Sequence, residues 1–245
     1  MEKSQTKFQA KVTDTRQSPL QKYQETVVGR PGVGALLAHE LTMLLCSGMP
    51  GALGFLLRKI FYARRLGSVG RGVVFGQQVV LRHPHKIRLG NHVMIDDQCV
   101  LDAKGCAGQD FVIGENVIIS RGCVLSAKDG ALSIGENSNF GAHCLVYAVN
   151  HVNIGQNTLF AAQCYVGGSM YHIERTDIPP IQQGSYADGV TIGDGCWLGA
   201  NVKVLDGVTI GDGVILGSGA VVNKDIPPFT VAVGVPAKVI KQRKA

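Results

Sequence analysis

Residues 190–225 read VTIGDG CWLGAN VKVLDG VTIGDG VILGSG AVVNKD, and this stretch decides the fold. Each group of six carries an aliphatic residue at its third position, usually followed by glycine. VTIGDG returns after 18 residues, so three hexads make one full turn. A period of six fits a short strand plus a tight corner, whereas a helix needs a period of about 3.6. The aliphatic anchors of this stretch are Ile192, Leu198, Val204, Ile210, Leu216 and Val222.

The same spacing continues towards the N-terminus through four further turns. Each turn alone cannot bury its apolar side, but stacked turns share one continuous core. Gly, Asn and Asp at the corners tolerate left-handed backbone angles. We therefore predict an all-β solenoid, triangular and parallel, over residues 73–226, anchored in these turns by Leu89, Ile95 and Leu101; Ile113, Ile119 and Leu125; Ile134, Phe140 and Val146; and Ile154, Phe160 and Val166.

The composition of the 245-residue chain agrees with a solenoid, whose core is thin. Hydrophobic residues make up 45% and charged residues 17%, which excludes a disordered chain. Aromatics are only 6%, while glycine numbers 32, and this favours tight turns and small inward residues over a thick core. The net charge of +6 permits an anionic partner such as a phosphate, a CoA ester or an acidic membrane surface. Most basic residues lie outside the repeat, with groups near residues 58–71 and at the C-terminal end, so we expect no nucleic-acid partner.

Seven cysteines without a CxxC motif argue against a disulfide framework and against a zinc site. Five of them share the fourth position after their anchor, which indicates inward packing as small apolar residues rather than a catalytic thiol. Because the first 34 residues are polar, we expect no signal peptide and a reducing, cytoplasmic environment. The five are Cys99, Cys123, Cys144, Cys164 and Cys196.

Residues 169–189 interrupt the repeat. The step between the anchors Ile154 and Ile192 exceeds one perfect turn by 20 residues, and the excess is the loop around SMYHIERTDIPPIQQGSYADG. A long loop on a regular scaffold is usually functional or disordered. This loop contains His, Glu, Arg and Asp, so the sequence favours a function for it.

The N-terminal third lacks the repeat. We expect a flexible polar arm over residues 1–34 and an apolar, basic helical segment over residues 35–72, split into two short helices around a Gly-Pro break. Its uncharged run is too short and too interrupted to span a membrane. An apolar stripe at helical spacing predicts either a cap packed on the solenoid or across a trimer, or a peripheral membrane contact through residues 41–65. The stripe is Leu53, Leu56, Leu57, Ile60 and Phe61, beside Arg58, Lys59, Arg64 and Arg65.

Residues ~73–243 resemble the hexapeptide-repeat acyltransferases. The chain is most similar to the maltose, galactoside and xenobiotic O-acetyltransferase branch, through the WLG element, the KDIPP element, the GVPAKVIK ending and the His-bearing loop. The resemblance implies a left-handed parallel β-helix, a homotrimer with active sites between neighbouring subunits, and acetyl-CoA or another acyl-CoA as co-substrate. Residues 227–245 would form a C-terminal cap and basic tail.

The resemblance also implies where the donor binds, without any permanently bound cofactor. Trp197 matches the tryptophan beside the CoA arm. Backbone groups of the next corners would bind the pantetheine, and lysines near the end of the solenoid would face the CoA phosphates. Each lysine could equally be an ordinary solvated charge, and Val235 replaces the asparagine usual in the family's ending. The further acyl-CoA positions are Gly199, Ala200, Gly217, Ser218, Lys224, Lys238 and Lys241.

Acyl transfer to a hydroxyl needs a base, and histidine suits this task near neutral pH. His172 stands at the point in the long loop where the family places its catalytic histidine, so we expect it to be the general base. The family often has a carboxylate three residues later, where this chain has Arg175; Asp177 or Glu174 could substitute. His143 replaces an acceptor-binding asparagine, and we expect it and Asp177 at the acceptor, although His143 could be a structural corner residue.

The other histidines receive structural interpretations. We expect a turn role for His151, a solvated turn for His83 and His85, and a structural place for His39. A zinc site of the γ-carbonic anhydrase kind needs three convergent histidines, and the spacings offer no clear set, so we expect no metal.

The function that follows is CoA-dependent O-acyl transfer to a sugar or glycan precursor, in polysaccharide biosynthesis, by a cytoplasmic enzyme that could attach to the cytoplasmic face of a membrane. Alternatives are N-acylation of an amino sugar, a non-catalytic trimeric scaffold of a glycan pathway, and a metal-dependent hydratase. The His-bearing loop and Trp197 favour the enzyme.

Overall fold

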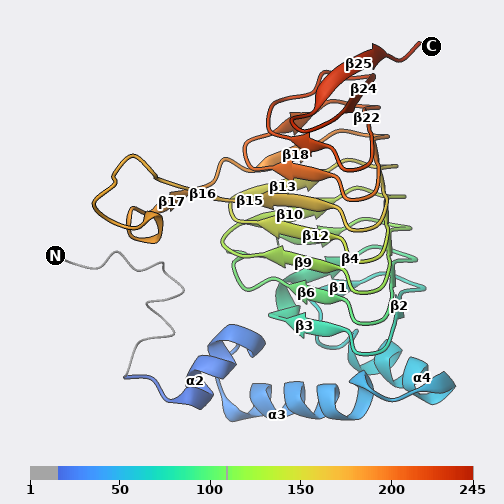
Figure 1. The fold of residues 1–245 in the computed structure, drawn as a ribbon. Helices are drawn as coiled ribbons and strands as arrows, with labels where there is room; N and C mark the ends of the chain where they lie inside the picture. Colours follow the sequence, from blue (N-terminus) through green and yellow to red (C-terminus); the bar gives the residue numbers. More distant parts are fainter. Residues whose placement is uncertain (1–15, 109, 245) are drawn as a thin grey trace.

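A computed structural model describes residues 16–108 and 110–244, and its strands wind as a left-handed parallel β-helix (Figure 1). The β-helix has three faces, here called sheets A, B and C. Sheet A contains β1 Ser68–Val69, β4 Ile87–Leu89, β7 Phe111–Ile113, β10 Ala131–Ile134, β13 His151–Ile154, β18 Val190–Ile192 and β21 Thr209–Ile210. Sheet B contains β2 Val74–Phe75, β5 Met94–Ile95, β8 Ile118–Ile119, β11 Asn139–Phe140, β14 Leu159–Phe160, β19 Trp197–Leu198, β22 Ile215–Leu216, β24 Thr230–Val233 and β25 Lys238–Gln242. Sheet C contains β3 Val80–Arg82, β6 Val100–Asp102, β9 Val124–Ala127, β12 Leu145–Ala148, β15 Tyr165–Gly168, β20 Lys203–Leu205 and β23 Val221–Val222.

The predicted anchors form the core. In sheet A, Ile134 pairs with Ile113 below and Ile154 above, and the ladder continues to Ile192 and Ile210. All five are buried. This one-to-one stacking of equivalent residues is what a fixed period across consecutive turns requires, and it confirms the predicted fold class.

The cysteine column is also inward, as predicted. All seven cysteines are free and buried. Each thiol of the repeated slot points at a backbone carbonyl oxygen at a corner of the solenoid, as in the 3.2 Å contacts from Cys144 Sγ to the oxygen of Ala161 and from Cys164 Sγ to the oxygen of Gly199. Burial raises the pKa of Cys196. The column therefore fills space as small buried side chains.

Two helices separated by a Gly-Pro break lie across the base of the solenoid, as expected (Figure 1). They are α3 Val33–Thr42, extended by the π-helical turn η2 Met43–Ser47, and α4 Gly51–Phe61. No helix within residues 16–108 or 110–244 combines the length and apolar character needed to cross a membrane.

The polar arm expected over residues 1–34 is helical where the structure describes it. Residues 1–15 lie outside the described residues, but α2 Pro19–Tyr23 and the π-helical turn η1 Gln24–Val28 follow. A capping box starts α2: the hydroxyl of Ser18 accepts from the backbone of Gln21, whose side chain accepts from the backbone of Ser18. The expectation of a flexible arm is therefore corrected for residues 19–28.

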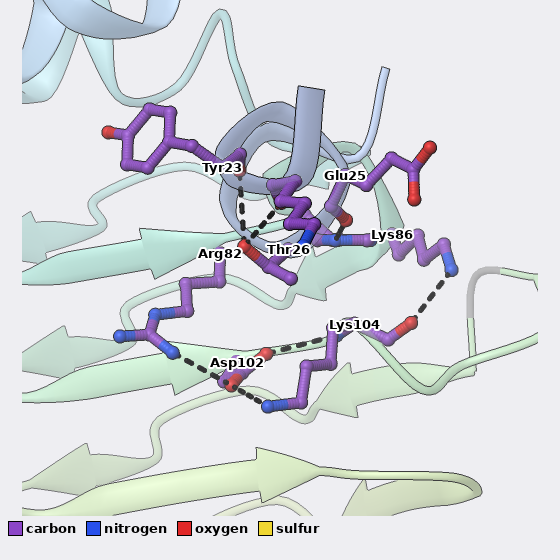
Figure 2. Close-up of polar contacts among 9 residues, drawn as sticks. Tyr23, Glu25, Thr26, Arg82, Lys86, Asp102 and Lys104 are labelled. Atoms are coloured by element: carbon purple, nitrogen blue, oxygen red, sulfur yellow. Dashed lines mark hydrogen bonds and ion pairs between the residues drawn. The ribbon is translucent and has the colours of Figure 1, made fainter. Parts of the chain in front are cut away.

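These N-terminal turns are held against the lowest turns of sheet C (Figure 2). The backbone of His83 donates to the oxygen of Val27, and His83 Nε2 lies 2.8 Å from the oxygen of Glu25. Next to it, Asp102 lies 3.7 Å from Arg82 and 3.4 Å from Lys104. The solvated turn expected at His83 is thus wrong, because a segment 58 residues away covers it.

The opposite end of the solenoid is closed by β24 and β25, an antiparallel pair that completes sheet B. Two 3-10 turns, η3 Pro84–Lys86 and η4 Pro180–Gln182, complete the elements apart from the hairpin described next. The two ends differ in character, because helices cover one and a β-hairpin covers the other.

Candidate functional site

The insertion over residues 169–189 is an ordered hairpin that projects from the solenoid (Figure 1). Strand β16 Met170–Tyr171 pairs antiparallel with β17 Ser185–Tyr186. His172 follows β16 directly, and its backbone donates to the oxygen of Gly184 at 3.1 Å. The pairing fixes the backbone of His172 at the end of a two-stranded stem.

Side chains organise the rest of this hairpin. The Gln183 amide nitrogen donates to the oxygens of Arg175 and Ile178, and its amide oxygen accepts from the backbone of Arg175. The Arg175 guanidinium donates to Asp177 and lowers the pKa of that carboxyl through this hydrogen bond. Asp177, an expected acceptor contact, is therefore paired within its own loop.

The imidazole of His172 is half exposed and has two neighbours. Nδ1 lies 3.8 Å from Oε2 of Glu174, and the ring centroid lies 5.1 Å from that of Tyr186. Since Glu174 is on the Nδ1 side, Nε2 is the nitrogen left for another molecule. Of the two carboxylates considered from sequence, the structure brings Glu174 to His172.

Another histidine lies beneath the root of the hairpin. A Cβ at Gly189 would lie 2.3 Å from Nδ1 of His151, so only glycine fits over this ring. The neighbouring Asn150 amide donates to the oxygen of Ala187 at 2.9 Å. These contacts tie the C-terminal end of the loop to the solenoid. His151 begins β13 and packs under Gly189, where the sequence predicted a turn role.

His143 lies at a different edge, the corner between sheets B and C. Its φ of 60° is left-handed, and its ring covers Gly122 of the previous turn, where a Cβ would be 2.4 Å away. The same corner of later turns holds Ala200 and Ser218: Asn201 donates to the turn before it, and Gly219 donates to Ala200. Thus His143, Gly199, Ala200, Gly217 and Ser218 share one edge of the solenoid.

Trp197 lies just before that edge, on the outer surface of sheet B. It is paired in register with Leu159 on one side and Ile215 on the other, and half of it is exposed. The surface beside the corner is therefore apolar, and it suits the alkyl part of a ligand whose amides pair with exposed corner backbone.

The three lysines predicted near the donor are all exposed and lie towards the C-terminal end. Lys224 follows β23, whereas Lys238 and Lys241 belong to β25. All three therefore lie at the last turn of the solenoid and its C-terminal cap.

Within one chain the two groups of residues are separated by the width of sheet C. Strands of this sheet start at the corner that holds His143 and Ala200, and β15 ends where the hairpin leaves. The hairpin then points away from the solenoid (Figure 1). A single copy therefore does not bring His172 to Trp197.

The structure adds one residue that the sequence did not single out. Tyr186 contacts His172 through the pairing of β16 with β17, and its only signal in the sequence is its place inside the same insertion. Among the described residues, no three His, Cys, Asp or Glu side chains gather as a metal site would need.

Comparisons with known proteins agree with this architecture. Residues 189–224 match the family described as bacterial transferase hexapeptide (six repeats), and residues 131–166 match the hexapeptide repeat of succinyl-transferase. The putative lipopolysaccharide biosynthesis O-acetyl transferase WbbJ of Escherichia coli is 36% identical over 53% of this chain and 70% of its own length.

Two further proteins are similar over different extents. The probable acetyltransferase Rv3034c of Mycobacterium tuberculosis is 36% identical over 54% of this chain, and the match spans only 44% of that protein. A solved N-acyltransferase from Bacillus cereus, AntD in complex with dTDP and 3-hydroxybutyryl-CoA, has a TM-score of 0.53 at 22% identity, covering 73% of this chain and 84% of that one. The last likeness concerns the fold.

Proposed function

Because the chain belongs to the hexapeptide-repeat acyltransferases, we propose that it transfers an acetyl or other acyl group from CoA to a hydroxyl of a sugar or glycan precursor. The observation that carries this proposal is the placement of His172. It is half exposed on an ordered hairpin, with Glu174 on its Nδ1 side and Nε2 left open.

In the proposed reaction, Nε2 of His172 takes the proton of the acceptor hydroxyl. The oxygen attacks the thioester carbonyl, the C–S bond breaks, and the new ester forms. The CoA sulfur leaves with the electron pair of that bond and receives the proton held by His172. The base is needed because a neutral hydroxyl is a weak nucleophile. A positioned base raises the rate by about 10²- to 10⁴-fold.

The acyl-CoA would lie along the corner between sheets B and C. Trp197 would pack on the pantetheine arm, and backbone groups at Gly199, Ala200, Gly217 and Ser218 would pair with its amides. Lys224, Lys238 and Lys241 would meet the phosphates as point charges. The exposed apolar surface around Trp197 supports this assignment.

Catalysis would then require a homotrimer. The separation of His172 from Trp197 within one chain supports a site in which the hairpin of one subunit meets the corner of its neighbour. His143 lies on that corner, where it could contact the acceptor, and Asp177 would reach the acceptor only by leaving Arg175.

We place the reaction in the cytoplasm, where acyl-CoA is made and thiols stay reduced. All seven cysteines are free thiols, which is consistent with such a compartment. The acceptor would belong to polysaccharide biosynthesis. An amino sugar is the nearest alternative, since the same base could deprotonate an ammonium before attack.

A thiol-release assay tests the proposal. Acetyl-CoA and longer acyl-CoAs are offered against sugars, nucleotide sugars and amino sugars, and the products are identified by mass. We expect release that depends on an acceptor and is lost in His172→Ala. Release without an acceptor, or acceptor-dependent release unchanged in His172→Ala, would overturn the mechanism. Product mass and ester lability to mild base separate O- from N-acylation.

A further inference from the structure

The two basal helices place their apolar sides away from the solenoid. Along α3 and η2, the residues buried against the rest of the protein are His39, Thr42 and Cys46. Along α4 they are Gly54 and Arg58, followed by Tyr62. These sets recur at helical spacing, so each helix turns its smaller or more polar side inwards, the reverse of an ordinary surface helix.

The inward side is fixed by specific contacts. Arg58 is buried and donates to the backbone oxygens of Phe75, Cys46 and Met49, at 3.0, 3.2 and 2.7 Å. A Cβ at Gly54 would lie 1.8 Å from the oxygen of Met49, so only glycine fits there. These contacts prevent α4 from rotating its apolar side into the protein.

The outward side forms one apolar surface, here called the apolar base. Its large hydrophobic side chains are between 37% and 79% exposed. Such a continuous patch marks an interaction site rather than ordinary protein surface. The apolar base consists of Val33, Leu37, Leu41, Leu44, Leu45, Met49, Leu53, Phe55, Leu56, Ile60 and Phe61.

A groove opens between the two helices beside the apolar base and reaches the inward residues Thr42 and Cys46. It has a volume of about 310 Å³ and is lined by Leu41, Leu45 and Phe61, together with Arg64 and Arg65. The Arg64 guanidinium lies over the Phe61 ring, 5.6 Å from its centroid. An apolar trough with two arginines fits a molecule that has both an alkyl chain and an anionic group.

The charge around the apolar base is mostly positive, and the acidic residue of α3, Glu40, accepts a hydrogen bond from the Tyr23 hydroxyl at 2.6 Å. The sequence contains no acidic residue between Glu40 and Asp96. The same stretch carries the basic residues Arg58, Lys59, Arg64, Arg65, Arg71, Arg82, Lys86 and Arg88. Arg58 is buried and Arg82 lies beside Asp102, so the positive charge next to the apolar base comes mainly from Lys59, Arg64 and Arg65. A surface that pairs apolar side chains with such an excess of positive charge matches the interface of a bilayer containing anionic lipids.

We propose that the apolar base docks on the surface of an anionic lipid bilayer, with the helices lying in the interface. The helices lie at the end of the solenoid opposite the C-terminus, so the solenoid would stand on the membrane with its C-terminal end away from it (Figure 1). Pairing of two bases is disfavoured, because a symmetric contact would oppose the same positive residues.

Vesicle flotation of the full chain tests this proposal, with phosphatidylcholine vesicles that contain or lack phosphatidylglycerol. We expect binding to the anionic vesicles that weakens with salt. Leu44→Glu and Leu53→Glu should each lower the vesicle partition coefficient by roughly tenfold or more. Lys59→Gln and Arg64→Gln should each lower it about fivefold, and only on anionic vesicles.

Val235→Glu is the matched control, because Val235 is 72% exposed but lies at the other end of the chain. Far-UV circular dichroism verifies that each variant folds. The salt dependence of vesicle binding is measured on the unmodified protein, so this part of the test does not depend on any variant folding. The proposal fails if the unmodified protein does not float, or if Val235→Glu lowers partition as much as Leu44→Glu. It also fails if Leu44→Glu lowers the mass in sedimentation while flotation is unchanged, since the apolar base would then join copies of the chain.

Discussion

Nδ1 of His172 lies 3.8 Å from Oε2 of Glu174, two residues further along the same hairpin. The carboxylate side chain is mostly exposed, so this contact does not stabilise the fold appreciably. Its consequence is orientational, because a carboxylate beside one imidazole nitrogen favours the proton there and leaves the other nitrogen free to accept.

Glu174→Gln should therefore lower kcat by roughly tenfold, less than removal of the base itself. The acyl-CoA KM should change little, since Glu174 contacts only the imidazole. Asp177→Asn serves as the comparison, because that carboxylate pairs with Arg175 instead. If Asp177→Asn lowers kcat more than Glu174→Gln, the orienting carboxylate has been misassigned.

His172→Ala should lower kcat by ~10²–10⁴ and leave the affinity for acyl-CoA nearly intact. The measurements are steady-state kinetics for kcat and calorimetric titration of CoA for binding. His151→Asn is the internal control, since that ring packs under Gly189 and should affect stability more than turnover. If His151→Asn loses turnover while His172→Ala stays active, the general base is His151 at the root of the loop and not His172.

Lys224→Ala and Lys238→Ala should each raise the acyl-CoA Kd by about five- to tenfold and make it less sensitive to salt. Trp197→Ala should weaken acyl-CoA binding without changing the salt dependence of that binding, because the contact of Trp197 with the donor is apolar. His143→Ala should instead raise the acceptor KM. If Lys224→Ala, Lys238→Ala and Trp197→Ala all bind CoA with the Kd of the unmodified protein, the corner between sheets B and C is not the donor site.

Repeats made the solenoid predictable, because Ile192, Leu198 and Val204 report a local period that every turn repeats. The helices were harder. Periodicity found the apolar stripe of α4, yet it could not say that Gly54 and Arg58 turn inwards and most of the stripe outwards, with Leu57 packed against the core. That choice depends on carbonyl groups of Phe75 and of the preceding turn, which no local pattern encodes.

The site shows the same division. The break in the repeat located the loop, and the family resemblance pointed to His172 within it. The contact with Tyr186 required knowledge of how β16 and β17 pair, and the burial of His83 required contact with Glu25, 58 residues away. Long-range pairing of this kind leaves no spacing signal in a single sequence.

Arg58→Met should reduce the free energy of unfolding by about 2–4 kcal/mol, because three backbone oxygens lose a buried donor. Urea denaturation measures the change. Lys59→Met is the neighbouring control, exposed on the same helix, and should change stability by less than about 0.5 kcal/mol. Equal urea midpoints for the two variants would mean that Arg58 does not hold α4 in place.

Acid should loosen the contact between the N-terminal helices and the first turns of the solenoid before it unfolds the solenoid itself. Burial lowers the pKa of His39 and His83 from 6.5, and burial together with Arg30 lowers that of His85 to about 4. The folded state thus favours the neutral rings. Their contribution to stability is complete above the unfolded value of about 6.5 and is lost as pH falls from there towards the folded values.

The thermal midpoint of the unmodified protein should therefore fall between pH 6.5 and pH 4, and His85→Gln should flatten this dependence because it removes one titrating ring. His92→Asn is the control. His92 is an exposed corner residue with a φ of 56°, and Asn116 and Asn137 occupy the equivalent corners with φ of 55° and 57°. This substitution removes a histidine that is not buried, so the acid slope should persist. If His92→Asn reduces the pH dependence of the thermal midpoint as much as His85→Gln does, acid acts on the solenoid itself. It would then not act on the contact between the helices and the first turns of the solenoid.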